Sequence, residues 1–207
     1  DSIDQIVLNC KNLNISSYSL SKPSVAIENF SSNTEFERCI FELDGSLVKG
    51  EEYALQITFS STFRNGQIIG FYRSPYTTIK NEIRYMTATK FEPTYARMAF
   101  PCFDEPSFKS TFQLTIEHHD NFTAKSNTNS KSIETISNET TTSSWKRTEF
   151  EETPKMVTYL LAFIISDFEC HHNQTQSLNG TKINVDICSS PPEINNTAYS
   201  LTKVSDI

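Results

Sequence analysis

The sequence predicts an all-β fold, and three observations support that prediction. First, apolar residues alternate with polar ones at a period of two, the spacing of a half-buried strand; the clearest runs are 53–59 and 112–116. Second, dipeptides that favour hairpin turns separate such runs: Asp44-Gly45, Asn65-Gly66 and Asn179-Gly180. Third, helical signals are few. The best one lies near the end, where Ser190 precedes two prolines and Glu193.

Two further segments complete the expected organisation. Residues 156–165 form a nearly continuous apolar run, which is typical of a central strand buried on both faces. Composition alone leaves a buried helix open as the alternative for this run. Residues 126–144 are rich in Ser, Thr and Asn and predict a hairpin and loop region. A short turn is expected after Asp104, capped by the Asp104 carboxylate.

Bulk composition limits the class of protein. The 207 residues suffice for one large β domain or two small ones, and because composition marks no boundary we expect a single domain over 1–207. The net charge of -7 and the lack of a Lys/Arg run argue against nucleic acid as a partner. The longest apolar stretch, 157–165, is far shorter than the ~20 residues that span a bilayer. We therefore expect any signal peptide or membrane anchor to have been removed or to lie outside this chain.

The cysteines and glycosylation motifs favour an extracellular or secretory-pathway location. The economical disulfides are Cys170–Cys188, which flank a predicted hairpin turn, and Cys10–Cys39, which lie in strand-like runs. Cys102 is then the odd cysteine, and its apolar neighbours predict a buried, unreactive thiol. Connectivity stays open at this point. Seven Asn-x-Ser/Thr motifs are potential glycan sites, at Asn14, Asn29, Asn121, Asn138, Asn173, Asn179 and Asn195.

Residues 89–106 carry a resemblance to a known family. They read TKFEPTYARMAFPCFDEP. This run resembles the signature T-Q-F-E-P-x-x-A-R-x-A-F-P-C-F-D-E-P of the zinc aminopeptidases related to aminopeptidase N and the endoplasmic-reticulum aminopeptidases. Residues 70–74 are similar to the preceding G-x-Y-R-S run of that family, and residues 155–163 to its K-M-S-T-Y-L-L-A-F strand. The resemblance extends from about residue 6 to residue 201.

The resemblance implies the N-terminal, non-catalytic domain of such an enzyme, with saddle-like packed sheets and a short helix beginning at the C-terminal end. It also implies that the family's first strands and its catalytic domain are absent from this chain. The motifs Gly-x-Met-Glu-Asn and His-Glu-x-x-His, which follow in the family, do not occur in these 207 residues. A fragment of a longer protein is the favoured explanation, and a short homologue without a catalytic domain is the alternative.

The resemblance also implies roles for individual residues. In the family, the Gln of T-Q-F-E-P and often its Glu help to hold the substrate's α-ammonium group. Glu92 matches the Glu, whereas Lys90 stands at the Gln position. An ammonium beside the substrate amine would be repelled by about 1–4 kcal/mol at about 4 Å, so we expect weakened or absent aminopeptidase activity in the parent protein. Arg97, Asp104 and Glu105 are expected to form a structural set of ion pairs and caps.

No residue of this chain is predicted to be catalytic or to bind metal. The four histidines form two adjacent pairs, which do not place two imidazoles on one helical face. The Cys170-His171-His172 run with Cys188 also lacks the spacing of a zinc site. Zinc is expected in the parent only if a catalytic domain follows.

Two function hypotheses remain at this stage. The chain is either one wall of the peptide cleft of a zinc aminopeptidase, or a catalytically dead relative that acts as an extracellular binding module or receptor-complex subunit. Expected partners are its own downstream domains or another extracellular protein, and a peptide N-terminus is a possible ligand. A free-standing hydrolase is poorly supported, because no nucleophile has a plausible base.

Overall fold

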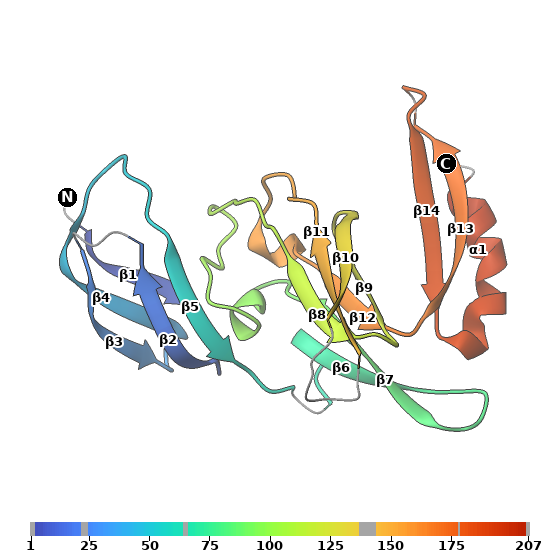
Figure 1. The fold of residues 1–207 in the computed structure, drawn as a ribbon, viewed down its shortest axis with the longest axis horizontal. Helices are drawn as coiled ribbons and strands as arrows, with labels where there is room; N and C mark the ends of the chain where they lie inside the picture. Colours follow the sequence, from blue (N-terminus) through green and yellow to red (C-terminus); the bar gives the residue numbers. More distant parts are fainter. Residues whose placement is uncertain (1–2, 22–24, 64–65, 137–143, 178, 206–207) are drawn as a thin grey trace. The chain divides into compact units, whose positions relative to one another are not determined.

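The computed structural model confirms an all-β chain that ends in a short helix (Figure 1). It describes all residues except 1–2, 22–24, 64–65, 137–143, 178 and 206–207. The eight strand pairings whose register the structure defines are all antiparallel. The chain folds into two compact units, and the expected single domain over 1–207 stays a prediction. The first unit contains 1–72, 89–112 and 152–162, and the second contains 73–88, 113–151 and 163–207.

The first unit contains a three-stranded sheet and a two-stranded ribbon. The sheet has the order β1 (Ile3–Asn9), β4 (Arg38–Leu47), β3 (Ile27–Asn33). The ribbon joins β2 (Asn14–Leu20) to β5 (Leu55–Ser60). Strand β5 alternates half-buried and exposed residues, as the period of two predicted.

The core of the first unit is apolar and contains a disulfide. Cys39 and Phe41 on β4 are almost fully buried, and Leu8 and Cys10 pack beside them. Partly buried side chains from both the sheet and the ribbon surround this cluster, including Phe30, Leu55 and Ile57. Cys10 is bonded to Cys39. The core therefore joins the two sheets and covalently ties the end of β1 to β4.

The second unit contains two further sheets, except that residues 70–72 of β6 and 89–90 of β7 belong to the first unit. One has the order β10 (Ser130–Ile136), β11 (Trp145–Phe150), β8 (Thr115–His119). The other has the order β6 (Gly70–Thr77), β7 (Ile83–Lys90), β12 (Phe163–Ser166), β9 (Thr123–Ser126). Ile116, Ala124 and Phe150 form the buried core, with Phe163 and Ile165 packed against it.

The C-terminal part of the second unit is a long hairpin followed by the helical segment. Strands β13 (Glu169–Gln176) and β14 (Lys182–Ser189) pair along their length, and Cys170 is bonded to its cross-strand neighbour Cys188. A turn containing Gly180, with φ of 82°, joins the two strands. The 3-10 helix η3 (Pro191–Thr197) starts after Ser190, as predicted, and leads into α1 (Ala198–Ser205), which packs on the hairpin.

Three sequence-based expectations about local structure were wrong. The run 156–165 is not one buried strand: it contains a single bridge at Met156, the 3-10 helix η2 (Thr158–Leu160) and then β12. Leu160 in this run is 52% exposed, although β12 itself is an inner strand of its sheet. In the middle of the run, the Leu160 and Leu161 N–H groups donate to the Val157 and Thr158 carbonyls. These local hydrogen bonds form η2 in place of a strand pairing.

The turn predicted at Asp44-Gly45 does not form either. Strand β4 continues through it, because pairing with both β1 and β3 outweighs the local turn preference. The Asp44 carboxylate accepts a hydrogen bond of 2.7 Å from the Ala26 N–H instead of closing a turn. The Asp104 carboxylate likewise turns back to Arg97 rather than capping the turn that follows it. Asn65, in a second predicted turn, lies outside the described residues.

No helix in the part of the chain that the structure describes is long and apolar enough to cross a bilayer.

Gly70, at the start of β6, gives a first testable prediction. Its φ is +66°, and an added Cβ would lie 3.1 Å from the Cβ of Met98. Gly66 has a similar φ of +74° but open space around it. Gly70→Ala should therefore lower the free energy of unfolding by about 3 kcal/mol, and Gly66→Ala by only about 1 kcal/mol. Urea unfolding measures both, and equal losses would contradict the close approach of Gly70 to Met98.

Candidate functional site

The candidate site begins where β7 ends, at Lys90, Phe91 and Glu92. The Phe91 side chain is 2% exposed, whereas Lys90 and Glu92 on either side of it are exposed. The Phe91 carbonyl accepts a 2.7 Å hydrogen bond from the Tyr95 N–H, which closes the turn after the strand. A buried anchor thus holds two exposed charged residues at the end of a strand.

After this turn, the short 3-10 helix η1 (Ala96–Met98) is packed into the first unit. Ala96 is fully buried and Met98 is 8% exposed. The Ala96 carbonyl accepts hydrogen bonds from the N–H groups of Ala99 (2.8 Å) and Phe100 (3.1 Å). The arginine of the motif, Arg97, lies in the middle of η1, with 13% of its side chain exposed.

The Arg97 guanidinium joins separate parts of the first unit. Its Nε donates to Asp104 Oδ2 at 2.9 Å and its Nη2 to the Asp104 carbonyl at 3.3 Å, while Nη1 donates to Glu37 Oε2 at 3.2 Å. The backbone N–H of Arg97 also donates to Asp104 Oδ2, at 3.3 Å. We call Lys11, Glu37, Arg97 and Asp104 the Arg97 network. The three guanidinium nitrogens donate to three different oxygen atoms. This arrangement requires the planar fork of an arginine, which a lysine does not have.

Glu37 is the member of the network that the sequence analysis did not find. It lies beyond β3 and has φ of 54°, in the left-handed region that non-glycine residues rarely adopt. Its carboxylate also pairs with Lys11, and its carbonyl accepts a 2.8 Å hydrogen bond from the Cys10 N–H. The hydrogen bond from Lys11 lowers the pKa of Glu37 below its ordinary 4.5 against the opposing effect of burial, and Arg97 adds to the lowering.

The second half of the 89–106 segment is attached to the end of β1. Asn9 and Cys102 exchange backbone hydrogen bonds of 2.8 and 3.1 Å, and the Asn9 side chain accepts a third from the Asp104 N–H at 3.1 Å. Cys102 is the free cysteine, and burial raises the pKa of its thiol to about 12. Such a thiol stays protonated at neutral pH and is a poor nucleophile. Glu105 is exposed, and its carbonyl closes the following turn with the Phe108 N–H at 3.0 Å.

The first unit also has an apolar groove of about 750 Å³ beside this segment. Phe100, Pro101 and Phe103 of the segment line one side, and the other lining residues come mostly from β1 and β5. Lys90 and Glu92 are not among its lining residues. Their expected position facing a concavity therefore stays a prediction.

The described residues give no support for a metal site in this chain. They contain no group of three or more His, Cys, Asp or Glu side chains placed to hold a metal ion. His118 is buried, with Nε2 3.0 Å from Thr148 Oγ1 and Nδ1 3.0 Å from the His119 carbonyl. Because a carbonyl only accepts, Nδ1 donates to the His119 carbonyl, so both ring nitrogens are engaged within the protein. Cys170, which precedes His171, forms a disulfide with Cys188, so neither sulfur is a free thiolate for a metal.

The described glycosylation motifs all lie on accessible parts of the chain. Six of the seven asparagines are exposed; they are Asn14, Asn29, Asn121, Asn173, Asn179 and Asn195. Asn138 lies outside the described residues. Exposure is the condition that a bulky glycan requires, so each of the six is sterically available.

Comparison with known proteins agrees with this arrangement. The profile of the Peptidase M1 N-terminal domain matches residues 1–160. The chain belongs to the peptidase M1 N-terminal domain family. The matched residues include the whole 89–106 segment and the two residues that pair with Arg97, Glu37 and Asp104.

The relatives of this chain include aminopeptidases that are much longer than it. It is 37% identical to aminopeptidase N of Rattus norvegicus over 158 residues, which is 76% of this chain and 15% of that protein. It is 43% identical to endoplasmic reticulum aminopeptidase 1 of Homo sapiens over 132 residues, 64% of this chain and 13% of that protein. Endoplasmic reticulum aminopeptidase 2 of Homo sapiens is 40% identical over 150 residues, 72% of this chain and 15% of that protein. The chain thus spans about 15% of the length of the relatives it matches.

Arg97→Lys tests the fork geometry. A lysine keeps the charge but does not reach Asp104 and Glu37 together, so we expect a loss of about 2–3 kcal/mol in the free energy of unfolding. Arg147→Lys is the matched control, since the Arg147 side chain is 49% exposed and pairs with Glu117 on the neighbouring strand β8. Its change should be barely detectable by chemical denaturation. Similar losses of unfolding free energy for both variants would show that the multiple contacts of Arg97 do not contribute to stability.

Glu37→Gln gives a prediction for pH dependence. The folded-state pKa of Glu37 lies below its ordinary 4.5, so the ionised carboxylate stabilises the fold above that pH. This contribution is lost as the pH falls through the folded pKa. At pH 7 the variant should unfold at lower urea concentration than the original chain, and the gap should shrink below about pH 4. A gap that stays constant down to pH 3 would argue against a paired carboxylate.

Proposed function

We propose that this chain is the N-terminal, non-catalytic domain of a secreted or membrane-anchored zinc aminopeptidase-like protein, and that it forms one wall of the peptide cleft. The observation that carries the proposal is the exposed carboxylate of Glu92, presented beside the buried Phe91 anchor in a segment held by the Arg97 network. No ion pair joins Glu92 to another described residue. Its charge is therefore available to an approaching peptide.

Glu92 suits the recognition of a free peptide N-terminus. An α-ammonium group is attracted to a carboxylate, and the hydrogen bonds between them are charge-assisted. The positioning is rigid on one side because Phe91 is buried and its carbonyl is bonded to the Tyr95 N–H. In the proposed cleft, Glu92 binds the amine while the zinc and the reacting groups come from a catalytic domain further along the parent protein. No residue of this chain is assigned to zinc.

Lys90 favours a second candidate function. It is exposed at the last residue of β7, two residues before the exposed Glu92, so both charges lie close together along the chain. An ammonium there opposes the binding of a second cation and offsets the attraction of Glu92. A catalytically dead relative that acts as an extracellular binding module, or as a subunit of a receptor complex, fits this substitution. Its partner would be another extracellular protein rather than a peptide substrate.

The proposed location is the secretory-pathway lumen or the extracellular space. Two disulfides and six exposed glycosylation motifs support it, because disulfides persist in oxidising compartments. Some relatives are named as endoplasmic reticulum aminopeptidases. The expected partners are the parent's own downstream domains.

The first test distinguishes the two candidates directly. The transcript is sequenced beyond the codon for Ile207 and the full-length protein is assayed for zinc and for N-terminal peptidase activity. A downstream Gly-x-Met-Glu-Asn motif, His-Glu-x-x-His motif and bound zinc support the cleft wall. Their absence contradicts it and supports the binding module.

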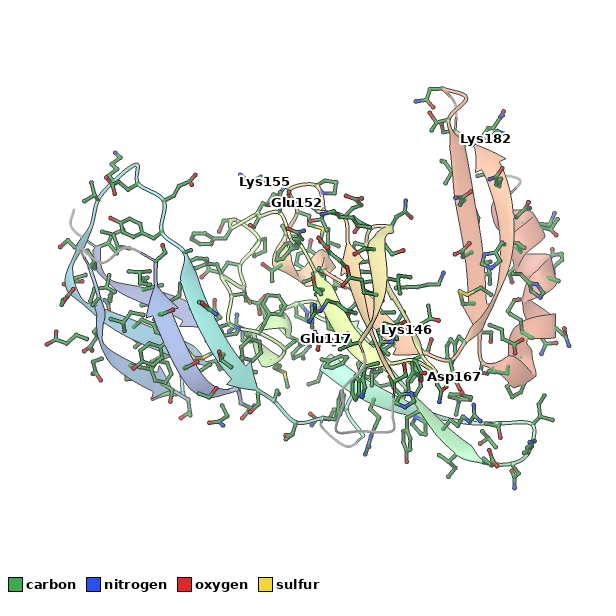
Figure 2. The ribbon with its side chains drawn as sticks, viewed as in Figure 1. Glu117, Lys146, Glu152, Lys155, Asp167 and Lys182 are labelled. Carbon is green, nitrogen blue, oxygen red and sulfur yellow. A yellow bond between two sulfur atoms is a disulfide. The ribbon has the colours of Figure 1, made fainter. Side chains whose placement is uncertain are left out.

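The second test measures the effect of Lys90 in the full-length protein. Lys90→Gln should raise kcat/KM for peptides with a free N-terminus about tenfold, because it removes a repulsion of about 1–4 kcal/mol. Glu92→Gln should lower it, and Lys155→Gln, at another exposed lysine of the first unit, is the control that should leave it unchanged (Figure 2). An unchanged kcat/KM for Lys90→Gln would contradict the assignment of Lys90 to the cleft.

A further inference from the structure

A pocket of about 650 Å³ lies in the second unit, beside the turn that joins β8 to β9. Its lining residues are Arg84, Tyr85, Asn121, Phe122 and Asp167. Its size is within the range of about 300–1,000 Å³ that is typical of small-molecule sites. Neither the peptide-cleft proposal nor the Arg97 network uses any of these residues.

Strand register explains why these residues meet. Thr123 on β9 pairs with Ser166 on β12, and Ile165 on β12 pairs with Thr87 on β7. Continuing the antiparallel register sets Asp167 opposite Phe122 on one side and opposite Tyr85 on the other. The pocket therefore lies at the end of three adjacent strands of one sheet.

The polar side of the pocket is held in place by hydrogen bonds. Asp167, labelled in Figure 2, accepts from Arg84 Nη1 at 2.8 Å through one oxygen and from the Tyr76 hydroxyl through the other. Burial raises the pKa of Asp167, but these two hydrogen bonds outweigh it and lower the pKa overall. Burial and then the bond to Asp167 raise the pKa of Tyr76 to about 12. The carboxylate is thus ionised and the phenol protonated at neutral pH.

The other side of the pocket is aromatic. Tyr85 is 44% exposed, and the Arg73 guanidinium lies 4.7 Å from its ring centroid. Because this cation covers one face of the ring, the exposed area of Tyr85 belongs to the rest of the ring. Phe122, which is half-buried, lines the pocket on the other side of Asp167. Fixed donors and acceptors next to an aromatic surface suit a sugar, whose hydroxyl groups form hydrogen bonds and whose C–H face packs on rings.

Asn121 connects this pocket to a glycan. It is exposed, lines the pocket and begins the motif Asn121-Phe122-Thr123. The turn is ordered by two hydrogen bonds to His119: from the Asn121 N–H to Nδ1 at 3.3 Å and from the Phe122 N–H to the carbonyl at 3.0 Å. We propose that Asn121 carries an N-linked glycan and that its first N-acetylglucosamine lies in this pocket against Tyr85 and Phe122. This rests on the secretory location proposed above.

Asn29 provides a matched comparison within the same chain. It begins the closely similar motif Asn29-Phe30-Ser31 and is also exposed. However, Phe30 packs into the core of the first unit, with its ring centroid 5.2 Å from that of Phe41. The Phe30 ring is therefore engaged in the core and does not offer a sugar on Asn29 an aromatic surface.

The first experiment compares the rates of glycan release from Asn29 and Asn121 in the original chain, without a variant. The full chain is expressed in glycosylating cells and treated, while folded, with a peptide N-glycosidase that cleaves the bond between the first sugar and asparagine. Mass spectrometry of glycopeptides should show release from Asn29 about tenfold faster than from Asn121, because the pocket shields the first sugar. After denaturation the two rates should be similar. Equal rates in the folded chain would overturn the proposal.

A second measurement uses a double-mutant cycle. Asn121→Gln, which removes the glycan, should lower Tm by about 3 °C in the original chain and by less than about 1 °C when Tyr85 is replaced by leucine. Asn29→Gln should show no such dependence on Tyr85. Equal Tm losses for Asn121→Gln in both backgrounds would overturn the pocket.

Occupancy in the native source separates this proposal from the proposed location. Glycans on other motifs with Asn121 bare would overturn the pocket and leave the secretory location intact. A native chain with no glycan at any motif would overturn both.

Discussion

The 89–106 segment depends on the contacts of one guanidinium, that of Arg97. An irregular segment lacks the regular hydrogen bonds of a sheet, so its buried polar groups need individual partners. Arg97 provides them at 13% exposure, and Asp104, its nearest partner, is 2% exposed. Because one guanidinium reaches both Asp104 and Glu37, the position of the segment and the unusual backbone of Glu37 stabilise each other.

The chemistry of the segment follows from this arrangement. Its charged residues divide into two kinds: Arg97 and Asp104 form internal contacts, whereas Lys90 and Glu92 are exposed on either side of the buried Phe91. The proposed function uses only the second kind.

The sequence predicted features that depend on local pairing and missed those that depend on tertiary contacts. The β13–β14 hairpin and the helix start after Ser190 were predictable, because their turn residues and prolines act within a few residues. Glu37 gave no signal, because its role arises only when Arg97, 60 residues away, folds beside it. The prediction of one buried strand over 156–165 was wrong, because η2 occupies the middle of this run. Apolar composition alone does not distinguish a strand from a helical turn. The pocket around Asn121 likewise depends on strands from three separate parts of the chain.

The Arg97 network is inferred to make the 89–106 segment a rigid support for Glu92. Native-state hydrogen exchange of individual backbone amides measures this most directly. We predict that the amides of Tyr95, Cys102 and Asp104 exchange as slowly as the amides of β4. They donate to the Phe91 carbonyl, the Asn9 carbonyl and the Asn9 side chain, respectively. Exchange at the rate of an open loop, while β4 stays protected, would contradict it.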